Sequence, residues 1–448
     1  MKRVLSRLKF LYHYIIGSIG FYPTLISLLF FGLAMCLIYL ETRGLSKSVK
    51  ENLPFFIITN GETARMVLSS ITTGLISLVV FSFTMVMLVL NQASSNFSPR
   101  VIPGLITYKA NQKILGLYLG TLIYTLVVMV NIRSDMYSEE LPGLAIFLAM
   151  CFTILCIIFF VYFIHAISQT IQIDNILESI YEITRKSLLK EEEKVNISQG
   201  QRLTSADTTN WHPLLCPKTG YLQTIDHKQV AEICRHHNVL ISFLQPMGSF
   251  LVEGTPFLMV NKPINDLDTF CEDMLDHANF YKAELVNTNY LYGFKQITES
   301  AIKALSPSIN DPGTAVRAID YLTDLLGIRM RLPDEEVLYD EEEKARVWVP
   351  KVNFDELCRN CLGPIRLYGK GDTVIVARLL FLLKTLLYKA SKSPGRIKSI
   401  QQHTQQLLID ASEVITNKVE RLNLNRLVTE MNKMNILDRE LTLMPAEA

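Results

Sequence analysis

The chain has 448 residues, of which 49% are apolar and 19% are charged, and its formal net charge is +1. With a mean hydropathy of only +0.23 the chain cannot lie in a membrane throughout, so we expect a membrane half and a water-soluble half. The near-zero charge and the absence of a long basic stripe argue against nucleic acid as a partner.

The first membrane span is predicted at residues 23–40. A lead with four basic residues and no acidic one precedes it, and the uncharged run that follows is interrupted by Pro23. This run is too long for the apolar core of a cleaved signal peptide, and no small-x-small cleavage site closes it. We therefore expect a cytoplasmic N-terminus followed by a retained span.

The second span is predicted at residues 66–90, which carry no charged side chain in 25 positions, enough to cross a bilayer. It is unusually rich in hydroxyl groups and runs on into a polar segment. In hydrocarbon each such group needs a partner, so the polar side should face other helices, another subunit or water. The residues concerned are Ser70, Thr73, Ser77, Thr84, Asn91, Gln92, Ser94 and Ser95.

Two interpretations of this polar side stay open. Its hydroxyl groups can serve helix–helix contact, with each Ser or Thr bonded back to the carbonyl four residues earlier. Alternatively they line a water-accessible path through the membrane.

The third span is predicted at residues 114–132 and the fourth at 141–165. Gly116 and Gly120 have the small-xxx-small spacing that lets two helices approach closely, which predicts a packing face. The fourth uncharged run continues to residue 173, longer than a bilayer needs, so its helix should project from the membrane as a continuous stalk.

Three polar residues share one face of this fourth helix, namely His165, Gln169 and Gln172. They form either a polar seam at the membrane surface or a lining, proton-sensitive position. Seven basic residues in the lead and the second connector, against five in the other two loops, favour both termini in the cytoplasm.

The soluble half is predicted to contain a helical stalk and linker at 174–210, a small β-rich module at 211–262 and a mainly helical domain at 263–448. The run from Glu191 onward is expected to be linker or loop, the acidic tract at 334–343 a solvated excursion, and residues 397–434 one helix. The fold class is thus four transmembrane helices followed by a mainly α-helical (α+β) cytosolic domain.

A turn between two helices of this domain holds Asn310 and Asp311. Asp311 is followed by Pro312, which predicts a helix start with a side-chain acceptor at the cap. In the alternative, Asn310 and Asp311 are oxygen ligands for a cation or partners for Arg317. Cys358 and Cys361 make only a single pair, whereas zinc needs four ligands, so no metal or cofactor is expected.

No phosphate-binding loop, dinucleotide fingerprint or nucleophile elbow occurs, so we do not expect an enzyme. Three segments resemble the signature of an uncharacterised bacterial membrane family, domain of unknown function 2254. They are Ser-Ser-Asn-Phe-Ser-Pro-Arg at 94–100, Ala-Leu-Ser-Pro-Ser-Ile-Asn-Asp-Pro-Gly-Thr-Ala at 304–315, and Phe-Ile-His at 163–165 followed by Gln172. The resemblance spans nearly the whole chain and implies a multi-pass protein of the bacterial inner membrane, without an activity.

One departure from the family's pattern concerns residues 286–289. The family usually shows an Arg-Thr pair followed by Gln-Asp before the second motif, whereas this chain has Val-Asn-Thr-Asn there. Any role of that arginine and aspartate therefore cannot be carried over.

Two functions are compatible with these features. The first is an oligomeric channel or transporter-like protein, in which the second span lines a path for an ion or small solute and the cytosolic domain forms a gate or vestibule. Its partners would be the lipid bilayer and further copies of the chain. The second is a membrane-anchored sensor or scaffold with a cytosolic ligand- or protein-binding domain. The lack of any acid or base within the spans counts against ion-coupled transport.

Overall fold

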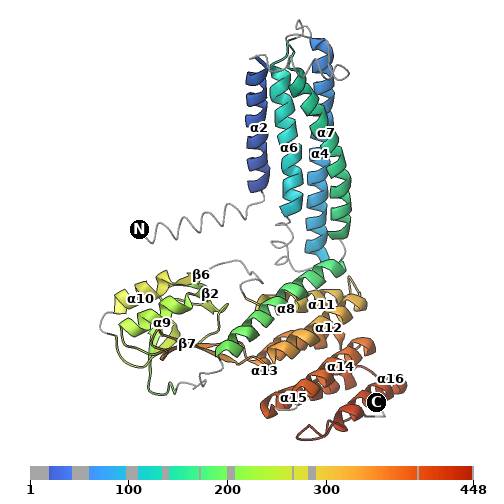
Figure 1. The fold of residues 1–448 in the computed structure, drawn as a ribbon. Coiled ribbons are helices and arrows are strands. Elements are labelled where there is room, and N and C mark those ends of the chain that lie inside the picture. Colours follow the sequence, from blue (N-terminus) through green and yellow to red (C-terminus); the bar gives the residue numbers. More distant parts are fainter. Residues whose placement is uncertain are drawn as a thin grey trace. The chain divides into compact units, whose positions relative to one another are not determined.

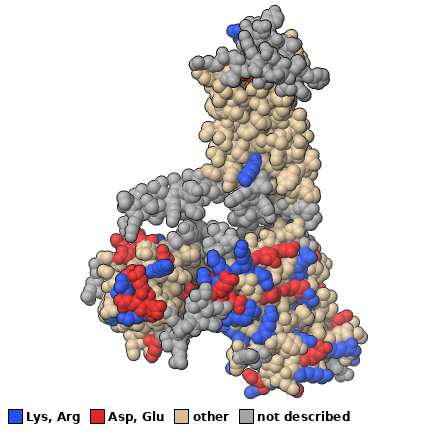
Figure 2. Space-filling view, viewed as in Figure 1, with Lys and Arg blue, Asp and Glu red and all other residues tan. Residues whose placement is uncertain are grey.

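The computed structural model describes residues 20–42, 60–96, 109–133, 141–170, 173–198, 207–264, 267–280, 289–390 and 393–445. The chain divides into two compact units, Met1–Asn175 and Ile176–Ala448. Each is described by itself below. Figure 2 shows that the exposed side of the N-terminal unit is almost wholly uncharged, whereas Lys, Arg, Asp and Glu crowd the C-terminal unit.

In the described part of the N-terminal unit, four long helices lie side by side (Figure 1). They are α2 (Phe21–Thr42), α4 (Gly61–Asn96), α6 (Lys109–Val130) and α7 (Gly143–Thr170). Each contains a stretch long and apolar enough to cross a membrane, at Phe21–Glu41, Gly61–Gln92, Asn111–Val130 and Gly143–Ile167. The four helices predicted at 23–40, 66–90, 114–132 and 141–165 are therefore confirmed as apolar helices of spanning length.

The glycines of α6 form the packing face that their spacing predicts. A Cβ atom on Gly116 would lie 2.8 Å from Cδ1 of Ile26, and one on Gly120 would lie 3.0 Å from the ring of Phe30. Both neighbours belong to α2, so α2 and α6 pack closely only because these two positions lack side chains. On the far side of α6 the hydroxyl of Tyr124 donates to the carbonyl of Ala145 in α7, at 2.9 Å.

The β-rich part of the C-terminal unit consists of two small sheets. One has the strand order β1-β5-β3-β8-β7 and the other the order β4-β2-β6. All pairs are antiparallel except β3 with β8. The strands are β1 (His212–Leu215), β2 (Gly220–Ile225), β3 (Ile241–Phe243), β4 (Phe250–Leu251), β5 (Pro256–Val260), β6 (Ala278–Phe280), β7 (Glu335–Tyr339) and β8 (Ala345–Pro350).

Two helices, α9 (His227–His236) and α10 (Leu267–Asp276), share one apolar core with these sheets. Ile241, Leu258 and Val347 lie at its centre and are fully buried. Strands from 278–280 and 335–350 thus complete sheets that begin in the module predicted at 211–262. The sequence did not predict these sheet contacts, because β8 pairs with a strand about a hundred residues earlier.

The acidic tract at 334–343 was wrongly expected to be a solvated excursion, because it forms β7 and the turn into β8. Leu338 turns inward and is buried, which gives the strand its place in the core. Asp340 holds the turn, since it accepts the backbone N–H groups of Glu342 and Lys344 and pairs with Arg346 at 2.7 Å. The acidic side chains therefore have local partners that a charge count does not reveal.

Helices make up the rest of the C-terminal unit. They are α8 (Ile173–Ser198), α11 (Leu291–Ala304), α12 (Pro312–Arg329), α13 (Phe354–Gly369), α14 (Thr373–Ala390), α15 (Pro394–Ser412) and α16 (Lys418–Asn432). Helix α8 continues through Glu191 to Ser198. The linker predicted to begin at Glu191 was therefore wrong for residues 191–198. Residues 171 and 172 lie outside the described part, so the continuity of the predicted stalk with α7 stays a prediction.

The single helix predicted at 397–434 is two helices, α15 and α16. Asn417 ends the intervening turn by accepting the N–H groups of Val419 and Glu420. The buried guanidinium of Arg421 donates to the carbonyl of Ser412, the last residue of α15, and to that of Ile415 in the turn. These side-chain bonds replace the missing backbone bonds and make the break favourable.

Candidate functional site

Helix α4 presents a polar face that no described part of the chain covers. Ser70, Thr73, Ser77 and Thr84 are all exposed on it. Their hydroxyl groups donate to the carbonyl oxygens four residues earlier, at 3.0, 3.0, 3.1 and 2.8 Å respectively. The back-bonding predicted for these residues is therefore present, and the described helices of their own chain leave them exposed.

This polar face has a seven-residue repeat. Ser70, Ser77, Thr84 and Asn91 follow one another at intervals of seven, and Thr73, Val80 and Met87 follow each of the first three by three residues. The buried side repeats in the same way, through Leu68, Leu75, Ser82 and Val89. Alternating steps of three and four are the spacing by which helices of different chains pack along a shared seam.

The structure describes the side chains of only some of the other polar residues predicted for this path. Gln92 is exposed on α4 and His165 is exposed on α7. Ser94, Ser95 and Gln169 lie within α4 and α7, but their side chains lie outside the described part of the chain, as does Gln172 altogether. The hydroxyl residues of α4 that do face the neighbouring helices are Thr72 and Ser82, both buried.

The turn at Asn310 and Asp311 is a helix start, as the cap interpretation predicts. Both carboxylate oxygens of Asp311 bind Thr314, one accepting its backbone N–H at 3.1 Å and the other its hydroxyl at 2.6 Å. These bonds hold the pKa of Asp311 below its usual range. Asn310 is exposed with a φ of 48°, and Arg317 lies on the exposed side of α12.

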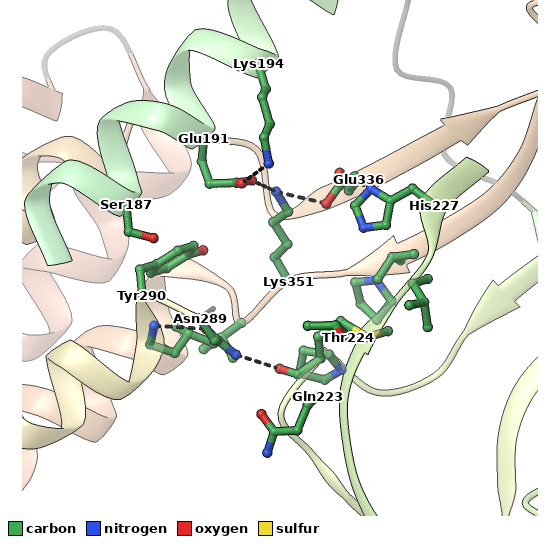
Figure 3. A pocket seen from close by; sticks show the side chains of 17 residues that line it. Ser187, Glu191, Lys194, Gln223, Thr224, His227, Asn289, Tyr290, Glu336 and Lys351 are labelled. Atoms are coloured by element: carbon green, nitrogen blue, oxygen red, sulfur yellow. Dashed lines mark hydrogen bonds and ion pairs between the residues drawn. The ribbon is translucent and has the colours of Figure 1, made fainter. Parts of the chain in front are cut away.

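A cavity of about 190 Å³ opens where α8 meets the β-rich part of the C-terminal unit (Figure 3). One wall comes from α8, another from β2 and the start of α9, and a third from β7, β8 and the residues that precede α11. The polar lining includes Ser187, Glu191, Lys194, His227, Glu336 and Lys351, and the apolar lining includes Pro246, Met247, Leu291 and Val349.

Charges of alternating sign run across this cavity. The ammonium of Lys351 lies between two carboxylates, 3.1 Å from Oε2 of Glu191 and 3.2 Å from Oε2 of Glu336 (Figure 3). Lys194 binds the other side of Glu191 at 2.6 Å, and Nδ1 of His227 lies 3.5 Å from Oε1 of Glu336. With the histidine neutral, the formal charges of this group cancel.

Lys351 and Glu191 are held in their charged forms although both are largely buried. Burial alone would raise the pKa of Glu191, but the ammonium groups of Lys351 and Lys194 outweigh it and lower that pKa. Burial likewise disfavours a charged Lys351, but the carboxylates of Glu336 and Glu191 outweigh it and raise the lysine pKa. The cavity therefore keeps a negative charge on Glu191 and a positive charge on Lys351 near neutral pH.

Helix α8 is fastened to the rest of this unit both before and among the residues that line the cavity. Arg185 binds Asp324 at 3.2 Å, and Arg331 binds Glu192 with both of its donors, at 2.6 and 2.8 Å. Near Arg185 the ring of Tyr181 stacks on that of Tyr321, with 4.4 Å between centroids. These contacts fix the wall that α8 contributes.

Comparison with known proteins gives a family. The family described as "Predicted membrane protein (DUF2254)" matches residues 17–385. The chain belongs to this family. An uncharacterized protein of Mycobacterium bovis, Mb1321c, and one of Mycobacterium tuberculosis, Rv1290c, are each 24% identical to it over 433 residues, which cover 93% of this chain and 81% of theirs. No solved structure matches the chain.

Membership of the DUF2254 family agrees with the four apolar helices, and with the signature segments from which the resemblance was inferred.

The cavity residues were not predicted from the sequence. Glu191 was assigned to a linker and Glu336 to a solvated tract, and Lys351 lies 160 residues from its partner Glu191. The only local signal was a lysine directly after an apolar strand, which is common on protein surfaces. Among the described residues, no group of three or more His, Cys, Asp or Glu is arranged to hold a metal ion.

Proposed function

We propose that this DUF2254 protein forms homo-oligomers in the bacterial inner membrane, in which the α4 faces of several copies line a water-accessible path for an ion or small solute. The C-terminal unit, on the cytoplasmic side, gates this path or forms its vestibule. The observation that carries the proposal is the seven-residue repeat of exposed polar residues on α4, opposite the face buried against its own chain.

The chemistry of this face suits contact with water and with other copies better than contact with lipid. Back-bonding satisfies each hydroxyl hydrogen, which lowers the cost of a dry environment, while each oxygen can still accept a bond from water. The amide of Asn91 carries two N–H donors and an acceptor, which a single bond back to the helix backbone cannot all satisfy within hydrocarbon. Small Ser and Thr side chains also let neighbouring helices approach closely along a seam.

Flux measurements on the purified chain in liposomes test the path. Replacing Ser77 by leucine adds bulk and dry surface to the proposed lining, where hydrophobic constrictions close pores by dewetting. Flux of small ions or uncharged solutes should fall several-fold while the oligomer size stays unchanged. The matched control is Ile76→Leu, next to Ser77 on α4 and also exposed, which should leave the flux as it is. A Ser77→Leu protein that conducts as well as wild type would refute the proposal.

The proposed orientation has its own test. A reporter fused after Ala448 should be active in the cytoplasm, and one inserted near Met136 should be active in the periplasm. The reverse pattern would place the C-terminal unit outside the cell and remove its proposed role as a cytoplasmic gate.

A second candidate function is a membrane-anchored sensor, and the polar cavity beside α8 is the observation that favours it. In that case α4 would serve only assembly, so Ser77→Leu should disturb the oligomer first. Absence of flux in the wild-type protein, together with a change in oligomer size in this variant, would favour the sensor over the channel.

A further inference from the structure

We propose that the cavity between α8, β2 and β8 binds a small zwitterion, of which a free α-amino acid with an apolar side chain is the best fit. Nothing in the channel proposal requires this ligand, and the site stands on its own geometry.

The charge arrangement selects against ligands with a net charge. Glu191 and Glu336 flank the ammonium of Lys351, and Lys194 binds Glu191 from the other side. A simple anion would meet these two carboxylates, and a simple cation would meet the buried ammonium between them. Either would leave an unbalanced charge in a partly desolvated site, which is costly. A molecule that carries both charges can pair with both signs at once.

The pairs already present show how a zwitterion would be held. Its carboxylate would accept hydrogen bonds from Lys351 and Lys194, and its ammonium would donate to the carboxylates of Glu336 and Glu191. Both kinds of bond exist inside the cavity now, at 2.6 to 3.2 Å, so the side chains already stand at bonding distance from groups of these types. The hydroxyl of Ser187 and the imidazole of His227 border the same space.

Size and lining complete the description of the ligand. The volume of about 190 Å³ is many times the roughly 10–15 Å³ that a single water requires, so the cavity has room for a small molecule such as an amino acid. Pro246, Met247, Leu291 and Val349 supply an apolar wall for a hydrocarbon side chain. Lys194 and His227, with side chains 56% and 49% exposed, stand where the cavity reaches solvent and leave a route for the ligand.

The site is also placed to report its occupancy to α8. Ser187, Glu191 and Lys194 all belong to α8, and the pair of Glu191 with Lys351 links α8 to the end of β8. A ligand that pairs with Glu191 and Lys351 replaces their direct ion pair by a connection through the ligand. Binding would therefore change how firmly this end of α8 is held.

The test uses the full-length chain in detergent and titrates three probes by calorimetry. L-Leucine is the zwitterion, 3-methylbutan-1-amine lacks its carboxylate, and 4-methylpentanoate lacks its ammonium. Trp348, directly before the lining residue Val349, gives a second readout by fluorescence. Leucine should bind, and each analogue should bind about tenfold to a hundredfold more weakly, because hydrogen bonds between charged groups are lost.

Two variants assign the binding to this cavity. Lys351→Gln and Glu336→Gln should each weaken leucine binding about tenfold or more. If the Lys351→Gln protein does not fold, Glu336→Gln alone still tests whether leucine binds in this cavity. The matched control is Glu192→Gln, the next residue of α8, which breaks an ion pair with Arg331 outside the cavity and should leave the affinity unchanged.

Three results would overturn the proposal. The first is equal binding of leucine and either singly charged analogue, which would make the site one for simple amines or simple carboxylates. The second is no leucine binding stronger than about 10 mM, with methionine and phenylalanine equally inactive. The third is a Glu192→Gln variant that loses affinity as much as Glu336→Gln does.

Discussion

Gly293 of α11 lies close against Thr184 of α8, and its substitution by alanine tests that contact. A Cβ atom there would overlap Oγ1 of Thr184 and would lie 2.8 Å from both its Cβ and its Cγ2. Thr184 is fully buried, and its hydroxyl donates to the carbonyl of Ile180 at 2.6 Å. Rotating the threonine moves Oγ1 and Cγ2 but leaves Cβ in place, so the two helices themselves must separate.

The expected magnitude follows from two opposing effects. Alanine in a helix is worth at most about 0.5–1 kcal/mol over glycine at Gly293, which lies in the first turn of α11, and this effect would stabilise the variant. Overpacking at a buried contact costs about 1–3 kcal/mol, and a clash with a fixed Cβ atom belongs at the upper end of that range. We therefore expect Gly293→Ala to lower the free energy of unfolding by about 1–2 kcal/mol.

Tryptophan fluorescence during denaturation of the full-length protein measures this change. The chain's two tryptophans, Trp211 and Trp348, both lie in the C-terminal unit, so the signal reports on that unit. Gly395→Ala in the first turn of α15 is the matched control, because nothing lies within 4 Å of its added methyl group, and it should raise stability by up to about 0.5–1 kcal/mol. A Gly293→Ala protein stabilised as much as Gly395→Ala would refute the close contact between α8 and α11.

Further predictions concern charges in the C-terminal unit. Arg329→Met should lower the free energy of unfolding by about 3 kcal/mol in the same assay, because the fully buried guanidinium donates to two carbonyls and a carboxylate. Arg331 is exposed, so Arg331→Met should cost less than about 1 kcal/mol, and equal costs for the two variants would contradict this. Asp311→Ala should cost about 0.5–2 kcal/mol through the lost cap, and a metal-dependent melting temperature in wild type would instead indicate a cation site. Glu191, with its pKa lowered in the fold, contributes stability that is lost as pH falls below about 4.3, and Lys351, with its pKa raised, contributes stability that is lost as pH rises above about 10.4. Glu191→Gln should therefore flatten the acid side of a stability–pH curve, and an unchanged acid side would contradict the pairing.

The membrane half could be predicted well because its signals are local. Absence of charge over 19 or more residues and the spacing of Gly116 and Gly120 each depend on neighbours in the sequence or on one helix face, and so does the helix start at Asp311 and Pro312 in the C-terminal unit. The structure places all of these as expected. The direction of the α4 hydroxyls could not be predicted, since a seven-residue polar repeat fits the inside of a bundle as well as its outside.

The cavity could not be predicted because its chemistry is assembled from distant segments. Glu191 stands in a run of three glutamates that indicates a solvated linker, and Glu336 stands in a second acidic run. Their common partner Lys351 follows an apolar strand and is buried only because β7 and β8 form a hairpin beside α8. Composition and residue spacing do not predict ion pairs between segments that meet only in the folded structure.

Cysteine accessibility and cross-linking at position 77 test the central claim most directly. In a protein whose native span cysteines are replaced by alanine, Ser77→Cys should react with water-soluble thiol reagents and form disulfide-linked dimers in membranes. Phe83→Cys, six residues on and about a third of a turn round α4, should do neither although Phe83 is 55% exposed. A cysteine at position 77 that stays unreactive and monomeric, or one that behaves like position 83, would contradict a water-accessible seam between copies.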